Sequence, residues 1–183
     1  SKMEFSKEKI LEINKKEIFK ISFTNDNNYS VTFFNLGGYI HSINIPYYRE
    51  INKLEDVVLG YSTLQDYIDD KSYFNCIIGR VCGRISNAQF ILNNKTYQLF
   101  SNDNHNHLHG GVSGFNKKIW SIKNLNKNLD TLICDLNYLS PHMEEGYPGN
   151  LNCTTQYTLN NNNEFTIKFN ATTDADTIIN LTN

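Results

Sequence analysis

Residues 153–171 read CTTQYTLNNNNEFTIKFNA, and this stretch indicates the fold more clearly than any other. Apolar or small side chains recur at every second position from Cys153 to Leu159, and the same period runs from Phe165 to Ala171. Successive residues of a strand point to opposite faces of a sheet, so each half presents one face to a core. The asparagines at 160–163 are typical of a turn. The stretch therefore predicts an antiparallel hairpin in which Cys153, Thr155, Tyr157 and Leu159 pair with Phe165, Ile167, Phe169 and Ala171.

The same alternation occurs along most of the chain. It runs through Phe19, Ile21, Phe23, Tyr29, Val31 and Phe33, through Phe90, Leu92, Tyr97 and Leu99, and through Leu132, Cys134, Leu136 and Tyr138. Polar turns at 25–28 and at 93–94 separate neighbouring runs. Helical periodicity is scarce, and one short helix is expected at 62–67 with Ser62 as its cap. Many short strands with turns between them predict an all-β antiparallel sandwich or barrel, in a single domain spanning 1–183.

Composition excludes several classes of protein. A chain of 183 residues can build one domain with a core, and its net charge of −2 argues against a nucleic-acid partner. No apolar run is long enough to span a bilayer, and residues 1–5 show no signal-peptide core, so a cytoplasmic protein is expected. Cys76, Cys82, Cys134 and Cys153 lie far apart, which in this setting predicts free, mostly buried thiols.

The densest polar cluster is HNHLHGG at residues 105–111. On a strand His105, His107 and His109 would point the same way, which leaves two functional interpretations open. Three histidines on one face could hold a metal such as zinc, or a single histidine could enter a pocket. From the residues alone, the default interpretation is that none of the three has a functional role. Metal sites need a coordination geometry that so short a peptide does not readily supply, so a metal is not expected.

Two further clusters carry chemistry-bearing side chains. The first, GRVCGRI at 79–85, contains Arg80 and Arg84, whose planar guanidinium groups can bind sugar hydroxyls or pair with surface carboxylates. The second is the loop SPHMEEGYPGNL at 140–151, made rigid by proline and glycine. Its adjacent Glu144 and Glu145 could act as acid and base, although consecutive acidic residues in a loop are more often solvated.

Taken in order, these clusters resemble the aldose 1-epimerase family. The chain matches the family's motifs in order. Gly-Arg and Arg-Ile lie at 79–80 and 84–85, Leu-His-Gly-Gly lies at 108–111, and a Gly-Phe-Asp-Lys-like stretch followed by Trp lies at 114–117 and 120. The Ser-Pro…Glu-Gly-Tyr-Pro-Gly-Asn-Leu loop lies at 140–151, and Asn-Leu-Thr-Asn lies at 180–183. Earlier stretches at 35–38 and 56–61 agree too. One such motif is weak, but an ordered series covering about residues 35 to 183 is specific.

The resemblance implies a large twisted β-sandwich, the galactose mutarotase-like supersandwich. It also implies interconversion of the α and β anomers of free hexoses such as galactose or glucose, without a cofactor. A base removes the proton of the anomeric hydroxyl while an acid protonates the ring oxygen, which requires groups with pKa values near neutrality. By motif, His109 would be the pocket histidine near the ring oxygen, and Arg84 would bind sugar hydroxyls together with position 83.

This sequence departs from the family pattern at two of these motifs. The family usually has Asn before the second arginine, where this chain has Gly83 and so lacks one hydrogen-bonding side chain. In the loop, the family's Ser-Pro-Asp-Gly is replaced by Ser-Pro followed by His142 and Met143. Both departures leave open an alternative function, a non-catalytic sugar or sugar-phosphate binding protein of the same fold.

The resemblance also implies that the sandwich is incomplete at its C-terminus. The family's acid histidine would directly follow Asn183, and its sugar-binding Asp and base Glu would lie farther on. We therefore expect the 183 residues alone to have little or no activity. We also expect the chain to associate with the missing C-terminal portion of the same protein, or with itself, through an exposed sheet edge.

Overall fold

The computed structural model describes residues 2–47, 50–56, 64–69, 76–77, 79–80, 84–85, 88–99, 102–103, 107–108, 110–111 and 114–181. For residues 46–47, 50–56, 64, 84–85 and 107 it describes the backbone alone. No helix in this part of the chain is both long and apolar enough to cross a membrane.

The N-terminal third forms an antiparallel sheet in simple sequence order. Its strands are β1 (Glu4–Ile13), β2 (Lys16–Thr24), β3 (Ser30–Phe34), β4 (Ile40–Tyr47) and β5 (Glu50–Asp56). The alternation predicted here is confirmed, because Ile21 and Phe23 are buried while Lys20 and Ser22 between and beside them remain partly exposed. One face of this sheet therefore contributes to the core.

The C-terminal part forms a second antiparallel sheet. Its strands are β10 (Ser121–Asn128), β11 (Thr131–Ser140), β12 (Leu151–Asn160) and β13 (Phe165–Thr173). The predicted hairpin is confirmed in its register, since Cys153 lies opposite Ala171 and Tyr157 opposite Ile167. The asparagine run forms the turn between the two strands.

Smaller elements join the two sheets. The hairpin of β7 (Gln89–Leu92) and β8 (Lys95–Gln98) turns at Asn93 and Asn94, as predicted, and both turn residues have positive φ. A short pair is made by β6 (Arg84–Ile85) and β9 (His107–Leu108). The helical segments are α1 (Leu64–Ile68), η2 (Phe115–Lys117) and η3 (Glu144–Gly146). The cap predicted at Ser62 lies outside the described residues.

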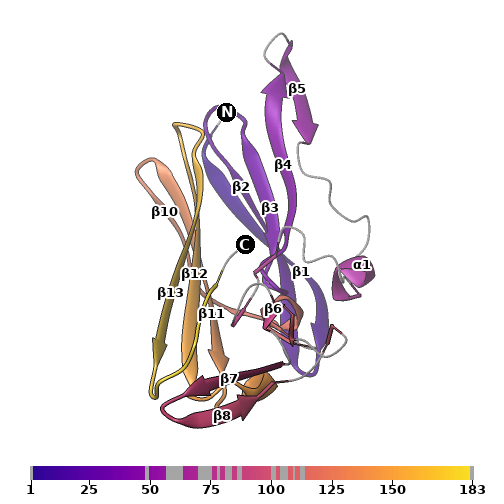
Figure 1. The fold of residues 1–183 in the computed structure, drawn as a ribbon. Coiled ribbons are helices and arrows are strands. Elements are labelled where there is room, and N and C mark those ends of the chain that lie inside the picture. Colours follow the sequence, from indigo (N-terminus) through magenta and orange to yellow (C-terminus); the bar gives the residue numbers. More distant parts are fainter. Residues whose placement is uncertain are drawn as a thin grey trace.

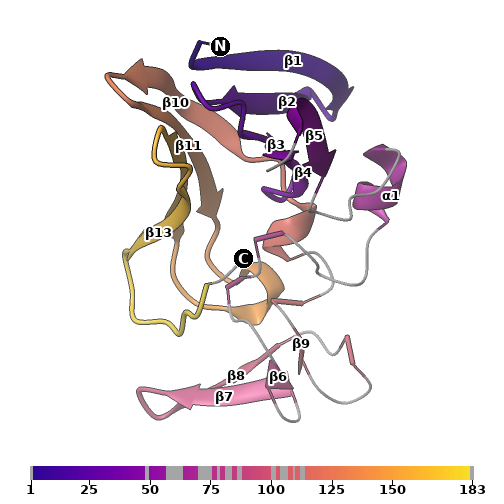
Figure 2. The same cartoon turned by 90° about the horizontal axis from the view of Figure 1, so that it is seen from above.

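The two sheets face each other, with the β7–β8 hairpin at the end of the molecule away from the N-terminus (Figures 1 and 2). Phe33 of β3 stacks on Tyr157 of β12 with 4.4 Å between ring centroids, and the Tyr157 hydroxyl donates a 2.8 Å hydrogen bond to the Gly38 carbonyl. The shared core contains Ile21, Phe23, Val31, Phe33, Ile40, Ile77, Phe115, Trp120, Leu132, Cys134, Leu136, Leu151, Cys153, Tyr157 and Leu159. The predicted all-β sandwich is confirmed.

Asparagine side chains tie the turn at 25–29 to the turn at 160–164. The Asn25 side chain is fully buried, and its amide donates to the Asn160 carbonyl at 2.9 Å and to Asn163 Oδ1 at 2.8 Å. Its Oδ1 accepts hydrogen bonds from the backbone N–H groups of Asn27 and Tyr29. The turns were predicted from the sequence, but this contact between the tips of two sheets was not.

We predict that Asn25→Ala lowers the free energy of unfolding by about 2–3 kcal/mol, because it leaves several buried backbone groups without partners. Urea unfolding would measure the difference. The matched control is Asn162→Ala, since that side chain is exposed in the same region and makes no hydrogen bond among the described residues. Equal unfolding midpoints for the two variants would show that the contact between the turns does not stabilise the fold.

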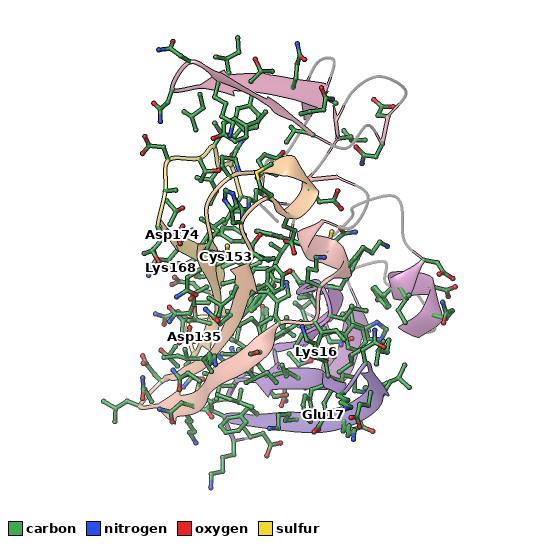
Figure 3. The ribbon with its side chains drawn as sticks, turned by 90° about the horizontal axis from the view of Figure 1, so that it is seen from below. Lys16, Glu17, Asp135, Cys153, Lys168 and Asp174 are labelled. Carbon is green, nitrogen blue, oxygen red and sulfur yellow. The ribbon has the colours of Figure 1, made fainter. Side chains whose placement is uncertain are left out.

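Cys76, Cys134 and Cys153 are buried, as predicted, and form no disulfide bond among the described residues; Cys82 lies outside the described residues. Cys153 lies on β12 in the sheet that also carries Asp135 and Lys168 (Figure 3). Burial raises the pKa of Cys134 and of Cys153 to about 12. Both groups are therefore neutral, inert thiols in the folded protein at neutral pH.

Two results follow for these thiols. In a Cys82→Ser background, a thiol reagent at pH 8 should label none of the three cysteines rapidly in buffer and all three in urea.

Because the folded pKa is raised, the stability from Cys134 and Cys153 is complete below the unfolded pKa of about 8.5 and is lost as pH rises toward 12. Urea unfolding at pH 8 and pH 10 should show this loss, and Cys134→Ala should reduce it. Rapid labelling of Cys134 or Cys153 in the native protein would contradict the burial on which both thiol predictions rest.

Candidate active site

The structure describes the sequence-predicted site residues only in part. Gly83 and His109 lie outside the described residues, as does His105. Arg84 is described by its backbone, which pairs in β6 with Leu108 of β9, the residue before His109 in the sequence. His107 is likewise described by its backbone, opposite Ile85. The pairing brings the arginine motif beside the histidine motif, while the roles of the side chains stay predictions.

The glycines after His109 are required by close packing. Gly110 has a φ of 87°, and a Cβ there would collide with the Gly79 carbonyl. Gly111 has a φ of 106°, and a Cβ there would lie 2.6 Å from Glu145 Oε2. Both conformations are in the region that glycine adopts without strain. The pair therefore allows the histidine motif to contact both the arginine motif and the loop at 140–151.

Arg80 lies at the centre of this region and is only 2% exposed. Its Nε donates to Ser140 Oγ at 3.0 Å, and its Nη1 donates to the Pro148 carbonyl at 2.8 Å. Its Nη2 lies within hydrogen-bond distance of the carbonyls of Ser140, Pro141 and Gly149, at 3.1, 3.1 and 2.8 Å. Pairing of Arg80 with surface carboxylates was one alternative from the sequence, and it is wrong because the guanidinium is buried among loop carbonyls.

Burial dominates the electrostatics of Arg80. It lowers the pKa of the guanidinium by desolvation, and the negative charge of Glu144 acts in the opposite direction. The ring of Tyr147 lies 5.8 Å from the guanidinium carbon, and burial raises the pKa of the Tyr147 hydroxyl. The site therefore combines one buried cation with neutral phenol groups.

Among the described residues, Glu144 is the carboxylate whose charge acts on the pKa of Arg80. Its Oε1 accepts a 2.8 Å hydrogen bond from Ser140 Oγ, and its Oε2 accepts a 2.5 Å hydrogen bond from the Tyr138 hydroxyl. Lys118 Nζ lies 3.6 Å from the same Oε2. Burial and the bonded carboxylate both raise the pKa of Tyr138. The expectation of simple solvation is wrong for Glu144, which is half-buried and bound on both oxygens.

His142 closes the loop at the position where the sequence departs from the family pattern. Its Nδ1 accepts a 2.7 Å hydrogen bond from the Gly149 backbone N–H, and its own N–H donates to Asn150 Oδ1 at 2.9 Å. The backbone N–H and the amide of Asn150 in turn donate to Asp174, which lowers the pKa of that carboxyl (Figure 3). The departure therefore fits a closed loop.

The remaining motifs pack around the same centre. The Arg80 carbonyl accepts a 2.9 Å hydrogen bond from the Asn180 backbone N–H, and Gly79 has no room for a side chain beside Phe115 and Leu181. Asn35 Nδ2 donates to the Trp120 carbonyl at 2.9 Å. The structure thus brings the described parts of these motifs into one region, apart from the stretch at 56–61, of which it describes only the backbone of Asp56 in β5.

Sequence reasoning missed two residues of this region. The sequence places Tyr138 only in an alternating strand, and Lys118 belongs to none of the motifs named above. Period-two alternation places Tyr138 on the inner face but does not indicate which end of the sandwich its hydroxyl reaches. The side chains of Ser140, Tyr138 and Glu144 are separated by two to six residues, a spacing that favours no particular contact in a loop.

The region offers hydrogen-bonding groups but no described metal site. Among the described residues no three His, Cys, Asp or Glu side chains gather as metal ligands, and the predicted histidine cluster lies mostly outside them.

Comparison with known proteins agrees with this geometry. Residues 20–183 match the sequence model of the family described as Aldose 1-epimerase. The chain is 38% identical over 131 residues to galactose mutarotase of Bos taurus, covering 72% of this chain and 36% of that protein. It is 33% identical over 181 residues to maltose epimerase of Levilactobacillus brevis, covering 98% of this chain and 52% of that protein.

Solved structures give the same result. Galactose 1-epimerase from Lactobacillus acidophilus superposes with a TM-score of 0.87 at 26% identity, covering 98% of this chain and 51% of the other. The chain thus spans about half or less of the length of these relatives. The family match over 20–183 and the shared fold lead to one conclusion: this chain belongs to the aldose 1-epimerase family.

Proposed function

We propose that the protein carrying this chain interconverts the α and β anomers of free hexoses, with galactose or glucose as substrate. The observation that carries the proposal is the convergence of the described family motifs around Arg80. Gly79 contacts Gly110, the Arg80 guanidinium binds the loop at 140–149, and its carbonyl binds Asn180. An interaction module of plain β-sandwich type would not require these segments to meet.

The proposed chemistry is acid–base ring opening. A base takes the proton of the anomeric hydroxyl while an acid protonates the ring oxygen; the carbonyl carbon turns, and the ring closes on its other face. We assign His109 a place near the ring oxygen and Arg84 a role in binding sugar hydroxyls together with position 83, where Gly83 supplies no side-chain hydrogen bond. The reaction as proposed needs no cofactor and no metal.

Further parts of the proposal concern the whole protein. His109 cannot serve as both members of an acid–base pair, so we propose that residues 1–183 alone have little or no activity. Together they form a single β-sandwich unit that completes its site with the C-terminal portion of the protein or, failing that, through self-association at a sheet edge. We also propose a cytoplasmic location.

The first test is a polarimetric rate on freshly dissolved α-galactose. We expect the full-length protein to accelerate mutarotation, and His109→Ala to lower kcat by about a hundredfold to ten-thousandfold. His105→Ala is the matched control and should leave kcat unchanged. If His105→Ala and His109→Ala were equally damaging, the three-histidine alternative would be favoured. Sugar binding without any rate above buffer would support the non-catalytic alternative instead.

A second test addresses Arg84. A lysine provides one point charge in place of a planar fork, so Arg84→Lys should raise KM for galactose about tenfold while changing kcat less. The same assay over a range of galactose concentrations separates the two constants. Arg49→Lys is the control for a conservative arginine change elsewhere in the chain. An unchanged KM in Arg84→Lys would remove Arg84 from the proposed sugar site.

A further inference from the structure

The hydrogen-bond network of Arg80, Ser140, Glu144 and the carbonyls of the 140–149 loop requires a charged group to be buried, which is unfavourable in free energy. A buried guanidinium loses its hydration, and replacing a buried ionic group with apolar side chains is often neutral or stabilising. Here the cation is retained, and its donors all point to one loop, at Ser140, Pro141, Pro148 and Gly149. Arg80 therefore determines the course of the chain from 140 to 149.

Glu144 continues the network on the inner side of the loop. Ser140 Oγ accepts from Arg80 and donates to Glu144, so the cation and the carboxylate are linked through a single hydroxyl. Tyr138 and Lys118 hold the other carboxylate oxygen. Glu144 is thereby held by three side chains from two segments, Tyr138 and Ser140 of β11 and Lys118 just after η2.

The loop also adopts backbone conformations that non-glycine residues usually avoid. Met143 has a φ of 66° and Glu145 a φ of 53°, on either side of Glu144. Left-handed conformations cost about 1–2 kcal/mol per residue and persist only when the surroundings enforce them. Such strain occurs most often at functional sites.

The consequence of this conformation is the placement of Glu145. Its carboxylate packs directly against Gly111, at a position where a Cβ on that glycine would lie 2.6 Å from Oε2. Gly110 packs against the carbonyl of Gly79, the residue before Arg80. The turn that follows His109 in the sequence therefore contacts both the Arg80 segment and the loop that Arg80 binds.

We propose that Arg80 and Glu144 are positioning residues for the epimerase reaction, because together they hold the 140–149 loop, and with it Glu145, against the Gly110–Gly111 turn. The inference rests on the proposed function and extends it to residues that need not touch the sugar. Their effect is to keep the turn in one geometry while a substrate changes between ring and open forms.

The test uses Glu144→Gln, Tyr138→Phe and the double variant in the full-length protein. Tyr138→Phe removes one hydroxyl and keeps the ring that packs 5.6 Å from Phe115 and 5.7 Å from Trp120, so it should fold. Small misplacements at a site can cost up to about a hundredfold. We expect Glu144→Gln to lower kcat about tenfold or more, with KM changed less than about threefold.

The double variant distinguishes positioning from general weakening. Because Tyr138 acts through Glu144, the double variant should have the same kcat as Glu144→Gln alone. Glu164→Gln makes the same change at an exposed carboxylate on the far turn and should leave kcat unchanged. Arg80→Met should lower kcat, and Arg80→Lys should lower it as well, because lysine lacks the planar guanidinium that binds several carbonyls at once. Hydrogen exchange at 110–111 and 140–149 should rise in each damaging variant.

The outcomes are distinct. An active wild type whose kcat is unchanged by Glu144→Gln and Tyr138→Phe, even with a lowered melting temperature, would overturn this inference alone and leave the proposed function standing. Additive losses in the double variant would also overturn it. An inactive wild type would overturn the proposed function and the positioning role together. The positioning role is supported if Glu144→Gln lowers kcat with KM nearly constant and the double variant has the same kcat as Glu144→Gln alone.

Discussion

The guanidinium of Arg80 is a full positive charge in an almost inaccessible position, and it constrains its whole neighbourhood. A buried cation is tolerated only when hydrogen bonds replace its lost hydration. Here the replacement comes mainly from backbone carbonyls of a single loop. Those carbonyls converge on the guanidinium only if the loop adopts one conformation. The hydrogen bonds that replace the hydration of Arg80 therefore also determine the conformation of the loop.

The sandwich provides the frame in which this can happen. Phe33 and Tyr157 join the two sheets through stacked rings, and the Tyr157 hydroxyl reaches across to Gly38. At the turns, Asn25 ties the two sheets again through a buried amide. These links hold the two sheets together, and Ser140, at the end of β11 in the second sheet, accepts a hydrogen bond from Arg80.

Much of the fold followed from the sequence, because period-two alternation and asparagine turns are local signals. The hairpin from Cys153 to Ala171 has the predicted register, and the turn at Asn93 and Asn94 lies where it was expected. The environment of Arg80 could not be predicted in the same way. Its acceptors are carbonyls, which every residue carries, so no side-chain pattern marks them. The family resemblance indicated which segments matter and gave no indication that Glu144 would be bound through Tyr138; the roles of His109, Arg84 and Gly83 stay predictions.

The indirect link between Arg80 and Glu144 has a physical rationale. A direct bidentate pair would occupy two donors of the guanidinium with one carboxylate and leave fewer for the loop. With Ser140 Oγ between Arg80 and Glu144, only the Nε–H of Arg80 is used for the link to the carboxylate, through two hydrogen bonds. Both Nη groups remain available for carbonyls. The carboxylate still compensates the charge, since its field opposes the desolvation that lowers the pKa of Arg80. One hydroxyl thus allows the same cation to be neutralised by a side chain and to organise a backbone loop, which neither a lysine nor a direct ion pair could achieve with the same atoms.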